Sequence, residues 1–310
     1  MDIKERRIVK NVLINCMGLK QHEKFLVVTD EKLFELANMF HSGAGELGYE
    51  SLIVKYVSRN VHGEEPPQLI KDMLLSADVV LLLTSKSLSH TLARKAASKF
   101  GVRMASLPDI SREVVMRTLG FDYSKITEET NKTAKKLTRA KKIAVKTQSG
   151  TDISFSVIGR KGFSDTGIYK YKGRFGNLPA GEVCVAPLEG TAKGVIVIDA
   201  SIADMGKLNK PLTVEIKNGL VVKSKPEHFK KQLDKYGKNC RNIVEFGIGL
   251  NPKAHVTGNV LEDEKALGAC HFAFGTNISF GGKVKAPVHI DAVLHSPEIC
   301  LDGRLLNIGG

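Results

Sequence analysis

Apolar and polar positions follow different patterns in the two halves of the chain. In the first half, short apolar runs alternate with segments whose apolar residues recur three and four positions apart, as in a helix that begins after Asp30. Apolar strands between helices are typical of a parallel sheet buried on both faces. We expect an N-terminal α/β domain with strands at 25–29, 51–56, 79–83 and 103–106 and helices at 31–46, 67–75 and 92–100.

From about residue 140 the pattern changes to strands joined by short turns. Segments 142–146 and 152–157 flank a polar turn, and Asn218-Gly219 separates two further strands. An Asn-Gly pair strongly favours a hairpin because both residues tolerate positive φ. The second half is therefore predicted to be an α+β, mostly antiparallel domain with a helix near 226–235. The expected boundaries are an α/β domain at 1–125, a linking helix at 126–141 and an α+β domain at 142–310.

The chain is basic, with a formal net charge of +13. Much of the excess lies at 132–142 and 223–238, which lack interleaved base-stacking aromatic residues and match no nucleic-acid-binding motif. These stretches are predicted to be solvated helix faces that attract anionic substrates, without specific nucleic-acid binding.

The cysteines and the hydropathy of the chain indicate where the protein is located in the cell. The five cysteines are scattered without CxxC spacing, which is typical of a reducing environment. No apolar run approaches the roughly 20 residues that span a bilayer, and the N-terminus does not resemble a signal peptide. We expect a cytoplasmic protein that does not bind membranes.

Candidate metal ligands lie on a strand near the end of the chain. Segment 287–294 is apolar except at His289 and Asp291, and it begins with Pro287. Residues two apart on a strand point to the same face, so this imidazole and this carboxylate lie together. A buried carboxylate without a partner is costly, and a bound cation offsets that cost. The spacing predicts a metal site.

Similar polar insertions occur in other apolar segments of the second half. Glu182 and Glu245 each interrupt a strand, and His271 follows a short helix next to Cys270. Together with His289 and Asp291 they supply carboxylate and imidazole ligands. Glu262 and Asp263 are predicted to lie on the exposed start of a helix. Glu264 has two possible roles: a general base near a metal-bound water, or a third solvated acid of that helix start.

The motifs NLPAGEV, EFGIGLNP, DEKALGACHFAFG and HID resemble those of the thermophilic-type metalloaminopeptidases, which include aminopeptidase T and aminopeptidase S. The resemblance implies that 142–310 is a metal-binding catalytic domain. It also implies a homodimer with two divalent ions, commonly zinc or cobalt, and a peptide substrate. It also implies a ligand set: Glu182, Glu245, His271, His289 and Asp291. The leading hypothesis is a metal-dependent aminopeptidase in which Glu264 or Glu182 moves the proton of a metal-activated water.

One position departs from the aminopeptidase pattern. The family uses a metal-binding tyrosine seven residues after its first His, and Ile278 stands there in this chain. The related dihydroxypyridine ring-cleaving dioxygenase binds iron(II) through two His and one Asp, which His271, His289 and Asp291 would supply. The second hypothesis is therefore a mononuclear iron dioxygenase acting on a small aromatic substrate. The third is a catalytically inactive basic binding protein.

Overall fold

The computed structural model describes residues 1–278 and 281–308. The described chain forms two compact units, Met1–Thr127 with Asp165–Ala180 and Glu128–Ser164 with Gly181–Gly310. The domain boundaries expected from the sequence stay a prediction.

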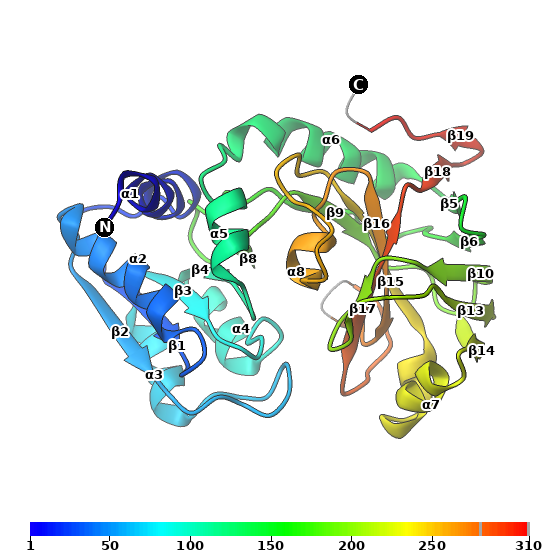
Figure 1. The fold of residues 1–310 in the computed structure, drawn as a ribbon, viewed down its shortest axis with the longest axis horizontal. Helices are drawn as coiled ribbons and strands as arrows, with labels where there is room; N and C mark the ends of the chain where they lie inside the picture. The colour runs from blue at the N-terminus through cyan, green and yellow to red at the C-terminus, as the bar shows by residue number, and fades with distance from the viewer. Residues whose placement is uncertain (279–280, 309–310) are drawn as a thin grey trace. The chain divides into compact units, whose positions relative to one another are not determined.

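The first unit is built on a parallel sheet in the order β2-β1-β3-β4-β8 (Figure 1). Apolar side chains of β1 and β3 pack against α3 and α4, and α2 also contacts both strands. This confirms the predicted α/β class. The elements are α1 (Ile3–Lys10), η1 (Asn11–Cys16), β1 (Phe25–Thr29), α2 (Phe34–Glu46), β2 (Ser51–Lys55), α3 (Gln68–Ser76), β3 (Val79–Leu83), α4 (Leu92–Lys99), β4 (Arg103–Ser106), α5 (Arg112–Thr118) and β8 (Phe175–Asn177).

The start of α2 differs from the prediction. Asp30 was expected to cap a helix from residue 31, but α2 begins at Phe34. The Asp30 carboxylate is buried and accepts from the backbone N–H of Leu33 at 3.4 Å. It accepts more closely from the backbone N–H and the hydroxyl of Ser85, both at 2.6 Å. A partner beyond the end of β3 therefore competes with the local cap.

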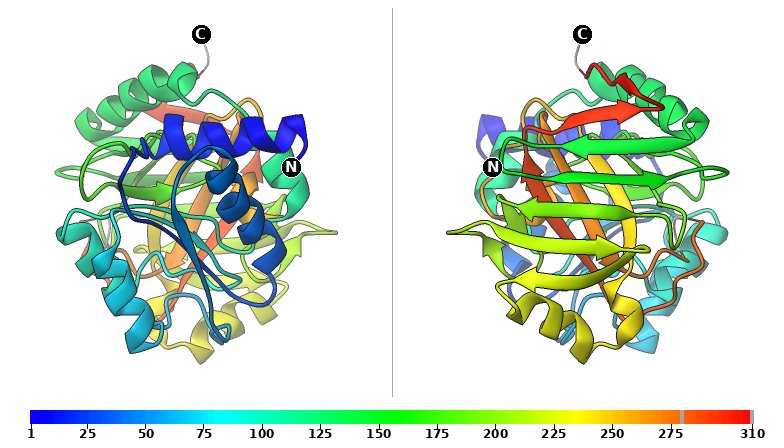
Figure 2. Two further views of the ribbon diagram at one scale, coloured as in Figure 1. Left: turned by 90° about the vertical axis from the view of Figure 1, so that its left-hand side faces the viewer. Right: turned by 90° about the vertical axis from the view of Figure 1, so that its right-hand side faces the viewer.

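The second unit contains two antiparallel sheets in the described residues, β14-β13-β10-β6-β5-β18-β19 and β12-β11-β17-β16-β15-β9-β7. The right-hand view of Figure 2 shows the first sheet in front, with strands of the second running across behind it. Helix α6 (Ser124–Arg139) leads into this unit. Its other elements are β5 (Lys142–Lys146), β6 (Asp152–Ser156), β7 (Phe163–Asp165), β9 (Glu182–Val185), β10 (Lys193–Ile198), β11 (Ser201–Ile202), β12 (Gly206–Lys207), β13 (Leu212–Lys217), β14 (Leu220–Lys225), α7 (His228–Lys235), η2 (Lys238–Arg241), β15 (Ile243–Gly249), α8 (Val260–Asp263), β16 (Ala269–Gly275), β17 (His289–His295), β18 (Glu298–Leu301) and β19 (Arg304–Leu305).

Aromatic residues join the two sheets of this unit. Phe155 of β6 packs edge-on against Phe246 of β15 and Phe272 of β16, with ring centroids 5.5 and 6.0 Å apart. The predicted hairpin forms between β13 and β14, where Asn218 and Gly219 have φ of 50° and 77°. The mostly antiparallel second half is thus confirmed, and its buried core supports the strands that carry the candidate ligands.

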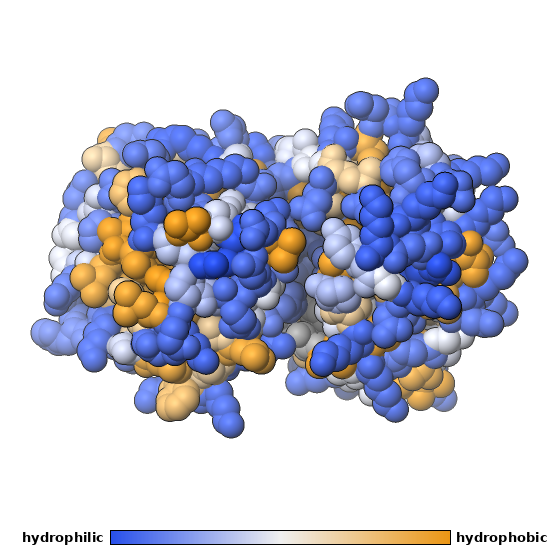
Figure 3. All heavy atoms as spheres, turned by 90° about the horizontal axis from the view of Figure 1, so that it is seen from below, coloured by the Kyte–Doolittle hydropathy of each residue, from blue (hydrophilic) through white to orange (hydrophobic). Residues whose placement is uncertain are grey.

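On the face seen in Figure 3, hydrophilic side chains predominate, and most of the hydrophobic side chains gather on the left of the view. Among the described residues, none of the helices combines the length and the hydropathy that a membrane span requires.

Candidate metal centre

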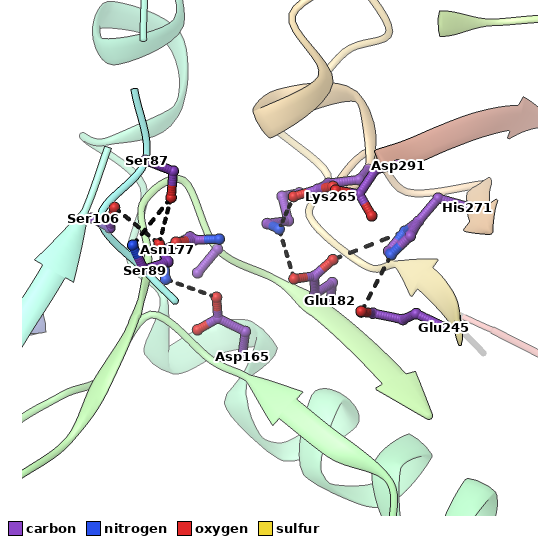
Figure 4. Close-up of polar contacts among 12 residues, drawn as sticks. Ser87, Ser89, Ser106, Asp165, Asn177, Glu182, Glu245, Lys265, His271 and Asp291 are labelled. Carbon is purple, nitrogen blue, oxygen red and sulfur yellow. Dashed lines mark hydrogen bonds and ion pairs between the residues drawn. The ribbon is translucent and has the colours of Figure 1, made fainter. Parts of the chain in front are cut away.

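Four neighbouring strands carry the predicted ligands. Glu182 opens β9, Glu245 lies in β15, His271 lies in β16, and His289 and Asp291 lie in β17. Because β17, β16, β15 and β9 are adjacent in that order, the structure brings all five side chains together. Figure 4 shows Glu182, Glu245, His271 and Asp291 directed toward one another. Their role as metal ligands stays a prediction.

The donor atoms form two groups, each with ligand atoms within 4.8 Å of one another. The first donor group is Glu182, Glu264 and His271, and the second donor group is Glu245, His289 and Asp291. A contact of 3.6 Å between His271 Nε2 and Glu245 Oε1 links them.

The second donor group has the spacing of a metal site. His289 Nε2 lies 3.2 Å from Asp291 Oδ1 and 3.1 Å from Glu245 Oε2. Ligand atoms at about 2.1 Å from one ion and at right angles to each other are separated by roughly 3 Å. The other ring nitrogen, Nδ1, lies 2.9 Å from the carbonyl oxygen of Thr276. Since a carbonyl only accepts, Nδ1 carries a proton, and Nε2 faces the site, where it becomes a metal ligand once it is deprotonated.

The first donor group already contains a cation. The ammonium of Lys265 donates to Glu182 Oε1 at 2.6 Å and to Glu264 Oε1 at 2.5 Å, and its side chain is fully buried. Glu264 therefore points into the site rather than into solvent, as one of the two interpretations of this residue required. Its role as a general base stays a prediction.

Two glycines of β15 make room for these side chains. A Cβ on Gly247 would lie 2.0 Å from His271 Cε1, so the imidazole occupies the space that any larger residue would fill. A Cβ on Gly249 would lie 2.1 Å from the carbonyl oxygen of Ala266, which brings the turn carrying Lys265 against the strand. The glycines of the EFGIGLNP motif thus shape the site.

The donor set fits a divalent metal. Among the described residues, Glu182 Oε2, Glu245 Oε2 and His271 Nδ1 are buried without a partner in hydrogen-bond geometry. A buried polar atom without a partner destabilises the folded protein unless a bound ion, water or ligand interacts with it. Carboxylate oxygens and imidazole nitrogens are ligands of iron and zinc.

The buried carboxylates of the site favour positive charge beside them, as the pKa shifts of the two imidazoles indicate. Burial opposes protonation of His271, but Glu245 and Glu182 outweigh it and raise its pKa to about 9. For His289, burial is likewise outweighed by Asp291 and Glu245, and the pKa is raised well above its ordinary value. Burial raises the pKa of Glu264 to about 8, although Lys265 opposes this shift. A dication would replace protons that the imidazoles otherwise hold.

Sequence reasoning missed two residues of the site. Lys265 carried no signal beyond its place beside Glu264. Cys184 is two residues after Glu182 on β9, so period-two spacing would have placed it on the same face. Burial and the nearby carboxylates of Glu245 and Glu182 raise the pKa of the Cys184 thiol, so this residue borders the site, whereas Cys270 belongs to the hydrophobic core.

The predicted exposure of Glu262 and Asp263 is wrong, because both residues are fully buried. Glu262 accepts from the backbone N–H of His255 at 3.0 Å. Asp263 accepts from the N–H of Thr257 at 2.7 Å and from the hydroxyl of Ser201 at 2.6 Å. These acids stabilise the loop before α8 instead of facing water.

The fold and the site define a protein of the class shared by aminopeptidase T and 2,5-dihydroxypyridine dioxygenase. Within this class, the family model NicX, described as 2,5-dihydroxypyridine 5,6-dioxygenase, matches residues 7–310. The chain therefore belongs to the 2,5-dihydroxypyridine 5,6-dioxygenase family, which is a family of enzymes. The predicted relationship to both kinds of protein is confirmed.

Individual comparisons give the extent of the similarity. The 2,5-dihydroxypyridine 5,6-dioxygenase of Pseudomonas putida KT2440 is 26% identical over 192 residues, which cover 56% of this chain and 55% of that protein. The structure of a 2,5-dihydroxypyridine dioxygenase from P. putida KT2440 superposes with a TM-score of 0.83 at 19% identity, covering 99% of this chain and 97% of that chain. AmpT from Thermus thermophilus gives a TM-score of 0.71 at 15% identity, covering 98% of this chain and 100% of that chain.

The leading prediction of an aminopeptidase, and with it the expected hydrolase and protease chemistry, is wrong. The family match is to dioxygenases, and the likeness to AmpT at 15% identity concerns the fold alone. Ile278 agrees with this correction, since an alkyl side chain, here 51% exposed, has no atom that ligates a metal where the peptidases use a tyrosine. The motifs misled because both activities draw on the same carboxylate and imidazole ligands.

Proposed function

We propose that this chain is a ring-cleaving dioxygenase that uses one ferrous ion and acts on a dihydroxylated pyridine. The observation that carries the proposal is the family match over residues 7–310, because it covers the whole set of candidate ligands. The relative in P. putida is named for opening 2,5-dihydroxypyridine between ring positions 5 and 6. The same class of substrate suits a basic chain with a formal charge of +13, since an ionised ring hydroxyl is anionic.

The donor set supports iron. Two imidazoles and one carboxylate with open positions are the ligand set of non-haem iron(II) oxygenases. We assign His271, His289 and Asp291 as the ligands, with Glu245 between the two imidazoles. When bound, ferrous iron supplies the one-electron chemistry that allows dioxygen to react with a closed-shell ring.

The protein groups next to these ligands would handle the proton of the ring hydroxyl. Glu182 Oε2 is buried, has no hydrogen-bond partner among the described residues, and lies 4.0 Å from His271 Nδ1. It is therefore placed to accept a hydroxyl proton, while its other oxygen is held by Lys265. Glu264, whose pKa is raised by burial to about 8 although Lys265 opposes this shift, is a second carboxyl group that could exchange a proton here.

Oxygen uptake tests the proposed function. Protein purified without oxygen and loaded with ferrous iron is expected to consume one O2 per 2,5-dihydroxypyridine. Mass spectrometry should find a product heavier by two oxygen atoms. An aminoacyl p-nitroanilide should not be hydrolysed with zinc, cobalt or iron. Anilide hydrolysis without oxygen uptake would contradict the proposal.

A variant of Glu245 tests the assignment of ligands. Glu245→Gln is expected to keep one iron per chain, because the amide preserves the size of the side chain and Glu245 is not among the assigned ligands. His271→Gln, measured alongside, should lose iron. Elemental analysis of both purified proteins decides the point. If Glu245→Gln loses iron and His271→Gln retains it, Glu245 replaces His271 in the ligand set.

A further inference from the structure

The site contains more donor atoms than one metal requires. The two donor groups together offer four carboxylates and two imidazoles, which is enough for two ions. We propose that the ammonium of Lys265 takes the place of a second ion, so that the chain binds a single metal, held by the assigned ligands His271, His289 and Asp291. This inference rests on the proposed function, which requires one iron.

The contacts of Lys265 support this role. Its Nζ lies 2.6 Å from Glu182 Oε1, a contact that Figure 4 shows. It also lies 2.5 Å from Glu264 Oε1. Two of the three ligands available to a metal at the first donor group are thus held by a cation of the chain itself. A metal ion on the same oxygens would meet the ammonium at close range in a buried site, where like charges repel strongly.

Lys265 cannot easily withdraw from this position. Its carbonyl oxygen accepts from the N–H of Asn251 at 2.8 Å, and its own N–H donates to the carbonyl of Glu262 at 2.9 Å. The carbonyl of the next residue, Ala266, packs against Gly249, where no Cβ would fit. The backbone at Lys265 is therefore fixed on both sides, and the side chain is fully buried.

Among the residues that the structure describes, the carboxylates of Glu245 and Asp291 are not held by an ammonium group. Within the described part of the chain, the ion-pair partners of Glu245 and Asp291 are the imidazoles of His271 and His289. Imidazoles lose their protons and become ligands when a metal binds, whereas an ammonium has no lone pair to offer until it is deprotonated. The assigned ligands His271, His289 and Asp291 can therefore accept a dication, whereas Glu182 and Glu264 are already held by the ammonium of Lys265.

Zinc, which is redox-inert, is the probe that tests this inference. After dialysis against excess zinc and removal of the unbound ion, elemental analysis should find one zinc per chain in the wild type. Lys265→Met, which keeps most of the length of the side chain and removes its charge, should bind two. Lys253→Met, a change at an exposed lysine on a nearby loop, is the matched control and should bind one.

A folding defect is separated from the expected result by a second variant. If circular dichroism shows that Lys265→Met does not fold, Lys265→Gln offers a neutral amide that can still donate hydrogen bonds to both carboxylates, and it should also bind two zinc ions. Two zinc ions in the wild type, or one in a folded neutral variant, would overturn the inference.

Oxygen uptake distinguishes failure of the inference on Lys265 from failure of the proposed function. Single-zinc binding by the wild type and double binding by the variant, without oxygen uptake by the iron-loaded wild type, would leave the role of Lys265 intact and reject the dioxygenase. Oxygen uptake by an iron-loaded wild type that binds two zinc ions would support the dioxygenase and reject the role of Lys265.

Discussion

Asp291→Ala is expected to reduce bound iron from one ion per chain to background, and His289→Ala should do the same. Both side chains come from the same face of β17, and His289 Nε2 lies 3.2 Å from Asp291 Oδ1. Removing only a hydrogen-bond partner of a metal ligand costs roughly 10–100-fold in affinity, so losing a ligand itself should cost more. Iron analysis of protein purified without oxygen measures the effect.

His295→Ala is the control for these two variants. His295 lies on the same strand but its side chain is exposed, so its loss should leave the iron content unchanged. Circular dichroism of all three variants checks that the fold persists. Normal iron content in folded Asp291→Ala or His289→Ala would remove the strand from the metal site.

Gly247→Ala is expected to destabilise the protein by about 1–3 kcal/mol and to lower its iron content. The new Cβ would lie 2.0, 2.4 and 2.7 Å from Cε1, Nε2 and Nδ1 of His271. Because the imidazole is buried in a packed site, it cannot move aside without displacing Glu245 or Glu182, which it contacts. Denaturant unfolding and elemental analysis measure the two effects.

Gly45→Ala is the matched control for the same chemical change. Gly45 lies within α2, and a Cβ there would have no heavy atom within 4 Å. Alanine is a better helix former than glycine, so this variant should gain about 0.5–1 kcal/mol and keep its iron. A Gly247→Ala protein with wild-type stability and iron content would show that His271 does not depend on this close approach.

Local patterns were sufficient to predict most of the fold. The apolar runs that became β1 and β3 have the length and composition of buried strands, and Asn218-Gly219 defined its hairpin. These signals depend on spacings of two to four residues, which the sequence contains directly. The local pattern failed at Asp30, where Ser85, distant along the chain, supplied a stronger partner than the helix start.

The candidate site was predictable only where its residues lie close together in the sequence. Period-two spacing placed His289 and Asp291 together, but it could not place His271 beside Glu245, because that contact depends on the register of β15 against β16. The function was less predictable still. Peptidases and oxygenases use the same ligand types, and only the match of the whole chain separated them.

The sequence by itself determined the two fold classes, the strands and the residue types of a metal site, because each follows from short-range spacing and side-chain chemistry. The tertiary structure alone decided that Lys265 enters the first donor group, that Asp263 is buried, and that Cys184 rather than Cys270 borders the site. Those outcomes depend on which distant backbone segments approach each other, and such approaches are set by strand register and by the space that Gly247 and Gly249 leave open.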